Sequence, residues 1–351
     1  MIKKLQQKLK DNGKGVLIIS EQNRRYFTSF PSSFGILLIT KNDAVFLTDS
    51  RYIEAAQNKI KDCRVEESRK LSEQLPSLCN EMGIVSLMGE SCITVAELRD
   101  MRRLFKPVKI SASGADKLIS SCREIKTDYE IEQIQTAQKI AEDAFEHILT
   151  VIKPGVAERE IALELDYFML RNGAEALSFE TIAVSGKNSS MPHGVPSDKK
   201  IETGDFITMD YGAVVNGYHS DMTRTVAVGK VTQKQKDIYN TVLEAQLAAI
   251  DKIREGVLLK DADLAARSII ESAGYGDCFR HSTGHGVGVE IHESPNLSPR
   301  AHGRLKAGNI VTVEPGIYIP DEFGVRIEDM VIVTKNGCVN LTGSKKDLII
   351  C

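Results

Sequence analysis

The sequence predicts two domains in series, a small α/β domain followed by a larger α+β domain. The 351 residues exceed twice the roughly 150 residues of a typical domain. Residues 1–110 alternate short apolar runs with amphipathic helical patterns, as α/β domains do. After residue 125, two helical patterns are followed by strand-rich sequence, which is typical of an α+β domain. We therefore expect domains at residues 1–125 and 126–351.

Short apolar runs in the first domain predict buried strands at residues 15–20, 35–40, 44–47 and 84–87. The segments between them carry apolar residues at helical spacing and predict helices at residues 51–60, 71–82 and 95–105. This alternation predicts a partly parallel sheet. No candidate catalytic residue stands out in this domain.

The second domain begins with a long helical pattern at residues 128–152, in which the apolar residues form one stripe. Pro154 and Gly155 end that helix. A second helix is expected at residues 157–171, ended by Asn172 and Gly173. Strand patterns follow, with two more helices expected at residues 233–253 and 261–273.

Charge and composition argue against several classes of protein. Lys and Arg number 45 and Asp and Glu number 48, and the net charge of −3 argues against nucleic-acid binding. No apolar run reaches the roughly 18 residues that a membrane span needs, and the polar start, Met1–Lys10, is unlike a secretory signal. The seven cysteines are scattered without a C-x-x-C pair, so we expect reduced thiols in a cytoplasmic protein.

Histidines indicate that metal or proton chemistry, if present, belongs to the second domain. All seven lie at or after His147, and six of them lie between His193 and His302. A lone histidine is more often structural than catalytic, and we expect a structural role for His147, His219 and His302.

Two carboxylates are expected to meet on a hairpin of this domain. Asn216 and Gly217 predict its two-residue turn, because both central residues of such a turn need positive φ. The turn places Asp210 opposite Thr223 and makes Asp210 and Asp221 diagonal neighbours on one face. Carboxylates this close repel unless a proton or a cation lies between them, and the apolar flanks of the hairpin favour a cation.

Three later segments add further candidate metal ligands. His285 lies in a glycine-rich stretch that does not fit a helical zinc pair, and Glu314 ends an apolar strand before a Pro-Gly turn. Residues 324–333 predict a strand that places Arg326 and Glu328 on one face, where charged side chains need partners. Four carboxylates and one imidazole suit divalent ions such as Mn²⁺, Fe²⁺, Co²⁺ or Zn²⁺. So many carboxylates indicate a pair of ions sharing a water, which is a known hydrolytic device.

These residues, in this order, resemble the dinuclear-metal pita-bread metallopeptidases, specifically aminopeptidase P and prolidase (Xaa-Pro dipeptidase). The matching motifs of the second domain are Met191–Gly194, Met209–Gly212, Ser220–Thr225, Ser282–Gly286, Val313–Gly316 and Arg326–Asp329. Tyr26–Phe30 and Thr48–Tyr52 resemble parts of the family's N-terminal domain, so the resemblance covers nearly the whole chain. It implies an α/β creatinase/prolidase-like domain followed by an α+β pita-bread catalytic domain.

The resemblance also implies a role for each site residue. It identifies five metal ligands, which are Asp210, Asp221, His285, Glu314 and Glu328. It places four further residues around the substrate, which are His193, His281, His292 and Arg326. The cofactor it implies is two divalent ions per subunit, with Mn²⁺ expected and Co²⁺, Fe²⁺ or Zn²⁺ compatible with the same ligands.

The implied reaction is hydrolysis of the peptide bond between an N-terminal residue and proline by a metal-bridging hydroxide. Glu314 would accept the proton of the water, because it lies beside the ions. His193 and His292 would stabilise the oxyanion and the substrate carbonyl. His281 would bind substrate, and Arg326 would bind substrate or support a ligand.

Two alternatives have to be weighed, a methionine aminopeptidase-like enzyme and a non-catalytic pita-bread binding module. The first usually lacks both an N-terminal domain and an arginine at the position of Arg326. The second has lost ligands, whereas this chain keeps all five. The family further implies a homodimer, and its expected substrates are peptides with proline at the second position, either dipeptides or longer.

Overall fold

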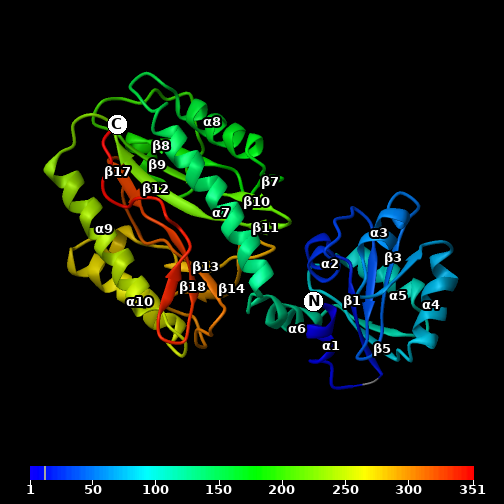
Figure 1. Ribbon diagram of the computed structural model, residues 1–351. Coiled ribbons are helices and arrows are strands. Elements are labelled where there is room, and N and C mark those ends of the chain that lie inside the picture. The colour runs from blue at the N-terminus through cyan, green and yellow to red at the C-terminus, as the bar shows by residue number, and fades with distance from the viewer. Residues whose placement is uncertain (12) are drawn as a thin grey trace. The chain divides into compact units, whose positions relative to one another are not determined.

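A computed structural model describes residues 1–11 and 13–351 (Figure 1). The chain forms two compact units, Met1–Arg123 and Glu124–Cys351. Within the described residues, no helix has the length and apolar character that crossing a membrane requires.

One six-stranded sheet organises the first unit, with strand order β4-β3-β2-β1-β5-β6. Its strands are β1 (Lys14–Ile18), β2 (Ile36–Ile39), β3 (Ala44–Thr48), β4 (Arg64–Glu67), β5 (Ser86–Met88) and β6 (Lys109–Ser111). β1 pairs antiparallel with β2 and parallel with β5, and the pairs β3–β4 and β5–β6 are also parallel. This confirms the expected partly parallel sheet.

The helices of the first unit are α1 (Ile2–Gln6), α2 (Glu21–Thr28), α3 (Ile53–Lys59), α4 (Leu71–Glu81), α5 (Val95–Leu104) and α6 (Ala115–Arg123). Leu75 of α4 packs with Leu17 and Leu47 of the sheet in a buried hydrophobic cluster. The sequence patterns predict α3, α4 and α5 but not α1, α2 or α6. α2 in particular is rich in polar residues, and it buries the charged Arg24 along with Phe27.

Four helices of the second unit agree with the predicted ones, in two pairs. They are α7 (Asp128–Ile148), α8 (Glu158–Arg171), α9 (Gln233–Lys252) and α10 (Leu259–Ser272). α7 and α8 pack on one apolar cluster with β-strand residues such as Met209, and α9 and α10 pack on another that includes Val331. In Figure 1 strands such as β13 and β18 lie between α7 and α10.

The second unit has several small sheets, with strand orders β12-β9-β8, β11-β10-β7, β14-β13-β15-β18-β19 and β16-β17. Its first strands are β7 (Ala176–Leu177), β8 (Ile182–Ser185), β9 (Phe206–Tyr211), β10 (Ala213–Val215), β11 (Tyr218–His219) and β12 (Met222–Ala227). The later ones are β13 (Gly284–Gly286), β14 (Glu293–Leu297), β15 (Ile310–Val313), β16 (Gly316–Ile319), β17 (Phe323–Arg326), β18 (Asp329–Val333) and β19 (Cys338–Asn340). Two short 3₁₀ helices, η1 (Gly186–Ser190) and η2 (Gly276–Cys278), complete the unit.

The single strand expected at residues 324–333 is wrong. β17 ends at Arg326 and pairs with β16, whereas β18 begins at Asp329 and pairs with β15 and β19. Between them the backbone N–H of Glu328 donates to the carbonyl of Thr223, 3.1 Å away. The chain therefore changes partners at this point, and a run of apolar residues cannot show where a strand changes its partner.

Candidate metal centre

The hairpin that carries two of the expected ligands has the predicted turn and register. Asn216 and Gly217 have φ of 50° and 81°, and β9 pairs with β12 so that Asp210 lies opposite Thr223. Asp221 directly precedes β12 and is 4% exposed. Both carboxylates thus lie on the same part of the hairpin, as the spacing predicts.

Two glycines let backbone segments meet next to ligands. A Cβ added to Gly212, two residues after Asp210, would overlap the carbonyl oxygen of Ser220. A Cβ added to Gly284, which precedes His285, would overlap the carbonyl oxygen of Thr312. Only glycine permits these close backbone contacts.

The remaining expected ligands come from the second half of the unit and meet the hairpin in the interior. Asp221, His285 and Glu328 offer ligand atoms that lie within 4.8 Å of one another. The Nε2 atom of His285 is 3.5 Å from Asp221 Oδ2 and 3.4 Å from Glu314 Oε1. The structure therefore brings together these four side chains from segments up to 107 residues apart (328 − 221).

Asp210 belongs to the same group, and only one of its two carboxylate oxygens has a hydrogen-bond partner among the described residues. Its Oδ2 accepts a hydrogen bond of 2.5 Å from Nη2 of Arg326. Its Oδ1 is buried and has no hydrogen-bond partner among the described residues. A buried carboxylate oxygen without a donor loses hydration, and a cation would compensate for that loss.

Burial and mutual repulsion change the pKa values of these groups. The pKa of Asp221 is raised well above its ordinary value, first by burial and then by the charges of Glu328, Asp210 and Glu314. Burial, followed by Glu314 and Asp210, raises the pKa of Glu328 in the same way. Burial also raises the pKa of Glu314 and lowers that of His285. Buried acids that repel one another, beside a neutral imidazole, fit divalent cations.

The tautomer of His285 suits a ligand. Its Nδ1 lies 3.0 Å from the backbone carbonyl of Gly286, which can only accept, so Nδ1 carries the proton. Nε2 therefore directs its lone pair toward Asp221 and Glu314. This is the arrangement that metal-binding histidines commonly have.

Arg326 connects the site to its surroundings and is 3% exposed. Besides Asp210, it donates to Thr223 Oγ1 (3.0 Å), to the carbonyl of Pro192 (3.2 Å) and to the hydroxyl of Tyr318 (2.7 Å). Arg326 thus orients one carboxylate and touches three other segments of the site.

Tyr318 was not predicted as a site residue. Its hydroxyl accepts from Arg326 and lies 3.0 Å from Nε2 of His281, whose Nδ1 lies 2.8 Å from the carbonyl of Ser282. Because that carbonyl only accepts, His281 is protonated at Nδ1, and Tyr318 donates to Nε2. Burial raises the pKa of Tyr318 to about 12 and lowers the pKa of His281, so both stay neutral at pH 7. No local pattern in the sequence signals this contact, since β16 is an ordinary apolar strand.

α10 holds the segment that leads from His281 to His285. Asp263 Oδ1 accepts from the backbone N–H (3.1 Å) and the hydroxyl (2.8 Å) of Thr283. Arg267 pairs with Asp263 at 2.7 Å and donates to the carbonyls of Phe279 and His281, both at 2.9 Å. The Asp263–Arg267 ion pair therefore fixes the backbone from His281 to Thr283.

His292 and His193 complete the group of predicted site residues. The rings of His292 and His285 lie edge to face with centroids 4.3 Å apart. Burial and then His285 lower the pKa of His292. His193 is exposed and follows Pro192, whose carbonyl accepts the 3.2 Å hydrogen bond from Arg326.

The other histidines lie outside this group. His147 of α7 bonds Glu164 of α8 at 2.6 Å and stacks on Phe168. His219 is half-buried beside the hairpin turn, and His302 is exposed.

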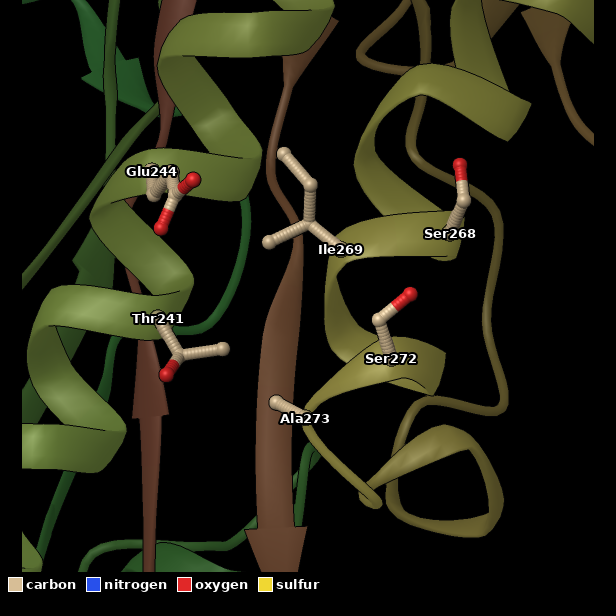
Figure 2. A pocket seen from close by; sticks show the side chains of 6 residues that line it. All are labelled: Thr241, Glu244, Ser268, Ile269, Ser272 and Ala273. Carbon is tan, nitrogen blue, oxygen red and sulfur yellow. The ribbon is translucent and has the colours of Figure 1, made fainter.

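A surface groove of about 410 Å³ lies between α9 and α10, away from these residues (Figure 2). Side chains from both helices line it, namely Thr241, Glu244, Ser268, Ile269, Ser272 and Ala273. None of the predicted site residues is among them, and Glu244 is the only titratable one. The groove is therefore separate from the carboxylate group.

Comparisons with known proteins find matches along nearly the whole chain. A family model described as metallopeptidase family M24 matches residues 132–335, and one described as the creatinase/prolidase N-terminal domain matches residues 1–125. The chain is 39% identical over 350 residues to an Xaa-Pro dipeptidase of Pyrococcus horikoshii, covering 99% of this chain and 98% of that protein.

Two solved structures are similar over nearly their whole length. An Xaa-Pro dipeptidase from Bacillus anthracis has a TM-score of 0.95 and 44% identity, covering 100% of this chain and 99% of the other. An X-Pro aminopeptidase from Thermotoga maritima has a TM-score of 0.92 and 35% identity, covering 99% of each chain.

Proposed function

The chain belongs to metallopeptidase family M24, and from that premise we propose that it hydrolyses the peptide bond between an N-terminal residue and proline. The proposal rests on one observation, which is that the side chains of four residues lie close together in the interior with Asp210 beside them. The four are Asp221, His285, Glu314 and Glu328. The names of the similar proteins supply the proline preference, because the carboxylates by themselves support only a metal-dependent hydrolase.

We further propose that Asp210, Asp221, His285, Glu314 and Glu328 hold two divalent ions, with Mn²⁺ expected. Five ligands of which four are carboxylates exceed what one divalent ion needs. When bound, the ions would polarise the scissile carbonyl and lower the pKa of a water molecule. The same ligands accommodate Co²⁺, Fe²⁺ or Zn²⁺.

The remaining roles are proposed from the family resemblance, together with the contacts of each side chain. Glu314 accepts a proton, which its raised pKa favours. His292, beside His285, and His193 would donate to the developing oxyanion and the substrate carbonyl. His281 would contribute to the wall of the substrate site, and Arg326 engages one oxygen of Asp210, which would leave the other to hold an ion.

Removal of the metal should abolish the activity. We expect exhaustive chelation to eliminate peptide hydrolysis and added Mn²⁺ or Co²⁺ to restore it, since the carboxylates require cations to act. Release of proline from Ala-Pro, followed by chromatography, is the measurement. Full activity in demetallated protein would contradict the mechanism.

Four peptides at equal metal loading test the specificity, namely Ala-Pro, Ala-Pro-Ala, Ala-Ala and Met-Gly-Met. We expect the proline peptides to be turned over best, and the ratio of the first two distinguishes a dipeptidase from an aminopeptidase. Better turnover of Met-Gly-Met than of both proline peptides would indicate a methionine aminopeptidase-like enzyme instead. Glu314→Ala serves as the inactive control, and we expect it to remain folded.

A homodimer is part of the same proposal, because the resemblance implies one. Sedimentation velocity at several protein concentrations measures the mass in solution. A stable monomer would remove any role for a subunit interface.

A further inference from the structure

Glu158, in the first turn of α8, is a buried carboxylate outside the ligand group. It is 1% exposed, and each of its oxygens accepts several hydrogen bonds. Oε1 accepts from the backbone N–H (2.6 Å) and the hydroxyl (2.9 Å) of Ser185. Oε2 accepts from the backbone N–H (3.1 Å) and the hydroxyl (2.6 Å) of Ser197. The side-chain amide of Asn188 donates to both oxygens at 3.1 Å.

Ser185 and Ser197 are the two ends of one segment, residues 185–197, which we name the His193 strap, and Asn188 lies inside it. The strap starts at the last residue of β8, continues through η1 and carries His193. Backbone bonds reinforce its second end, because the N–H groups of Glu158 and Arg159 donate to the carbonyls of Lys199 and Ser197. One carboxylate thus closes the strap into a loop.

The middle of the strap faces the site. Pro192, the neighbour of His193, accepts a bond of 3.2 Å from Arg326 through its carbonyl. Ser189 accepts a bond of 2.9 Å from the backbone N–H of Gly324 on β17. The strap is therefore fixed to α8 at its ends and to β17 in its middle, with the exposed His193 beside the latter contact.

We propose that Glu158 is a positioning residue for the peptidase reaction, acting through His193 by holding both ends of the strap. This inference rests on the proposed function, since it assumes that His193 contacts the substrate. A displacement of about 1 Å at a reacting group lowers a rate by roughly 100-fold. Supporting residues behind a site commonly contribute about 10- to 100-fold.

The chemistry of the contacts requires a carboxylate. Each of the groups bonded to the Glu158 carboxylate, from Ser185, Asn188 and Ser197, donates to it, and an ionised carboxylate is an acceptor only. Glu158→Gln keeps the shape but turns an NH₂ donor toward one end of the strap, so that end loses its acceptor. Glu160→Gln is the matched control, because Glu160 stands in the same helical turn and bonds Ala157 N–H, which lies outside the strap.

The test is a double-mutant cycle on kcat and KM for Ala-Pro, with Glu158→Gln, His193→Gln and the double variant. We expect Glu158→Gln to lower kcat about 10- to 100-fold with KM nearly unchanged, and Glu160→Gln to match wild type. In the His193→Gln background, Glu158→Gln should cause no further loss. A purely structural effect of Glu158 would instead add to that of His193→Gln.

A measurement without substrate separates this inference from the proposed function. In metal-free protein labelled with ¹⁵N-histidine, we expect the His193 ring resonance, identified from His193→Gln, to shift or broaden in Glu158→Gln and to stay unchanged in Glu160→Gln. Wild type that hydrolyses no proline peptide would overturn the proposed function, while the His193 resonance still decides whether Glu158 orders the strap.

Ser197→Ala is a milder variant that keeps the inference testable if Glu158→Gln does not fold, because it removes a single donor at one end of the strap. We expect it to shift the same resonance and to lower kcat less than Glu158→Gln does. A folded Glu158→Gln with wild-type kcat and an unchanged His193 resonance would overturn the inference. Additive losses in the cycle would overturn it as well.

Discussion

At the scale of single residues, the carboxylates of the site repel one another when no cation lies between them. The raised pKa of Asp221 reflects burial first and then the charges of Glu328, Asp210 and Glu314. Between its ordinary and its raised pKa, the folded protein keeps a proton that the unfolded chain has released. The contribution of Asp221 to the free energy of unfolding therefore falls as the pH rises through that interval.

Asp221→Asn should for this reason stabilise the metal-free protein at pH 7, because a neutral amide of the same size replaces a carboxyl group whose ionised form the fold disfavours. We expect its Tm without metal to exceed that of wild type, and the increase in Tm caused by Mn²⁺ to be mostly lost. Calorimetry with chelator and with Mn²⁺ measures both effects. Asp198→Asn, an exposed residue, is the control. A lower Tm for metal-free Asp221→Asn would contradict the repulsion.

Residue patterns predict Asp210 and Asp221 because their meeting depends on a local turn, Asn216-Gly217, and on the alternation of side chains along strands. They do not predict Tyr318 or Glu158. Each of these acts through partners 8 to 39 residues away that belong to other elements. Contacts of that kind follow from tertiary packing, which a single sequence does not display.

At the scale of elements, two side chains of α10 stabilise the segment that carries His281 and His285. Asp263 is 1% exposed and joins Arg267 to the backbone of Thr283, two residues before His285. Removing one partner of a buried ion pair leaves the other charge without compensation, at a cost of about 3–5 kcal/mol.

Asp263→Ala should therefore destabilise the protein by about 3 kcal/mol and lower the activity of the fraction that stays folded. Urea unfolding followed by circular dichroism measures the stability. Lys260→Ala, an exposed change on the same helix, should stay within about 0.5 kcal/mol of wild type. Equal stability of the two variants would show that the pair does not brace the segment.

Elements with one continuous apolar stripe, such as α7, are predicted closely, since periodicity alone identifies them. The break between β17 and β18 is not, because both halves are apolar and extended. Between them, the backbone N–H of Glu328 donates to the carbonyl of Thr223, which lies more than 100 residues earlier in the chain. That hydrogen bond separates the two strands.

At the scale of the whole molecule, each of three hydrophobic clusters draws its residues from one unit. One lies between Leu17 and Ile110, and the other two lie between Ala137 and Val333. All five proposed ligands belong to the second unit, Glu124–Cys351. The change of pattern near residue 125 is visible in the sequence because the elements on either side differ in kind.

A protein comprising residues 124–351 should fold and bind Mn²⁺ with an affinity close to that of the whole chain, since it keeps its own cores and every ligand. Isothermal titration of the metal-free fragment with Mn²⁺ measures this, with the Asp221→Ala fragment as the control that should bind weakly. Failure of a folded fragment to bind Mn²⁺ would show that the first unit is needed to complete the site.

The glycines beside Asp210 and His285 restrict how this site can evolve. Because Gly212 and Gly284 admit no added atom, selection cannot shift the backbone there by altering their side chains. It can, however, exchange the ligands themselves, one at a time, on a backbone that stays in place. Lineages that descend from such a sequence should therefore lose catalysis more easily than they reshape the backbone of the site, and an inactive descendant would inherit that backbone unchanged.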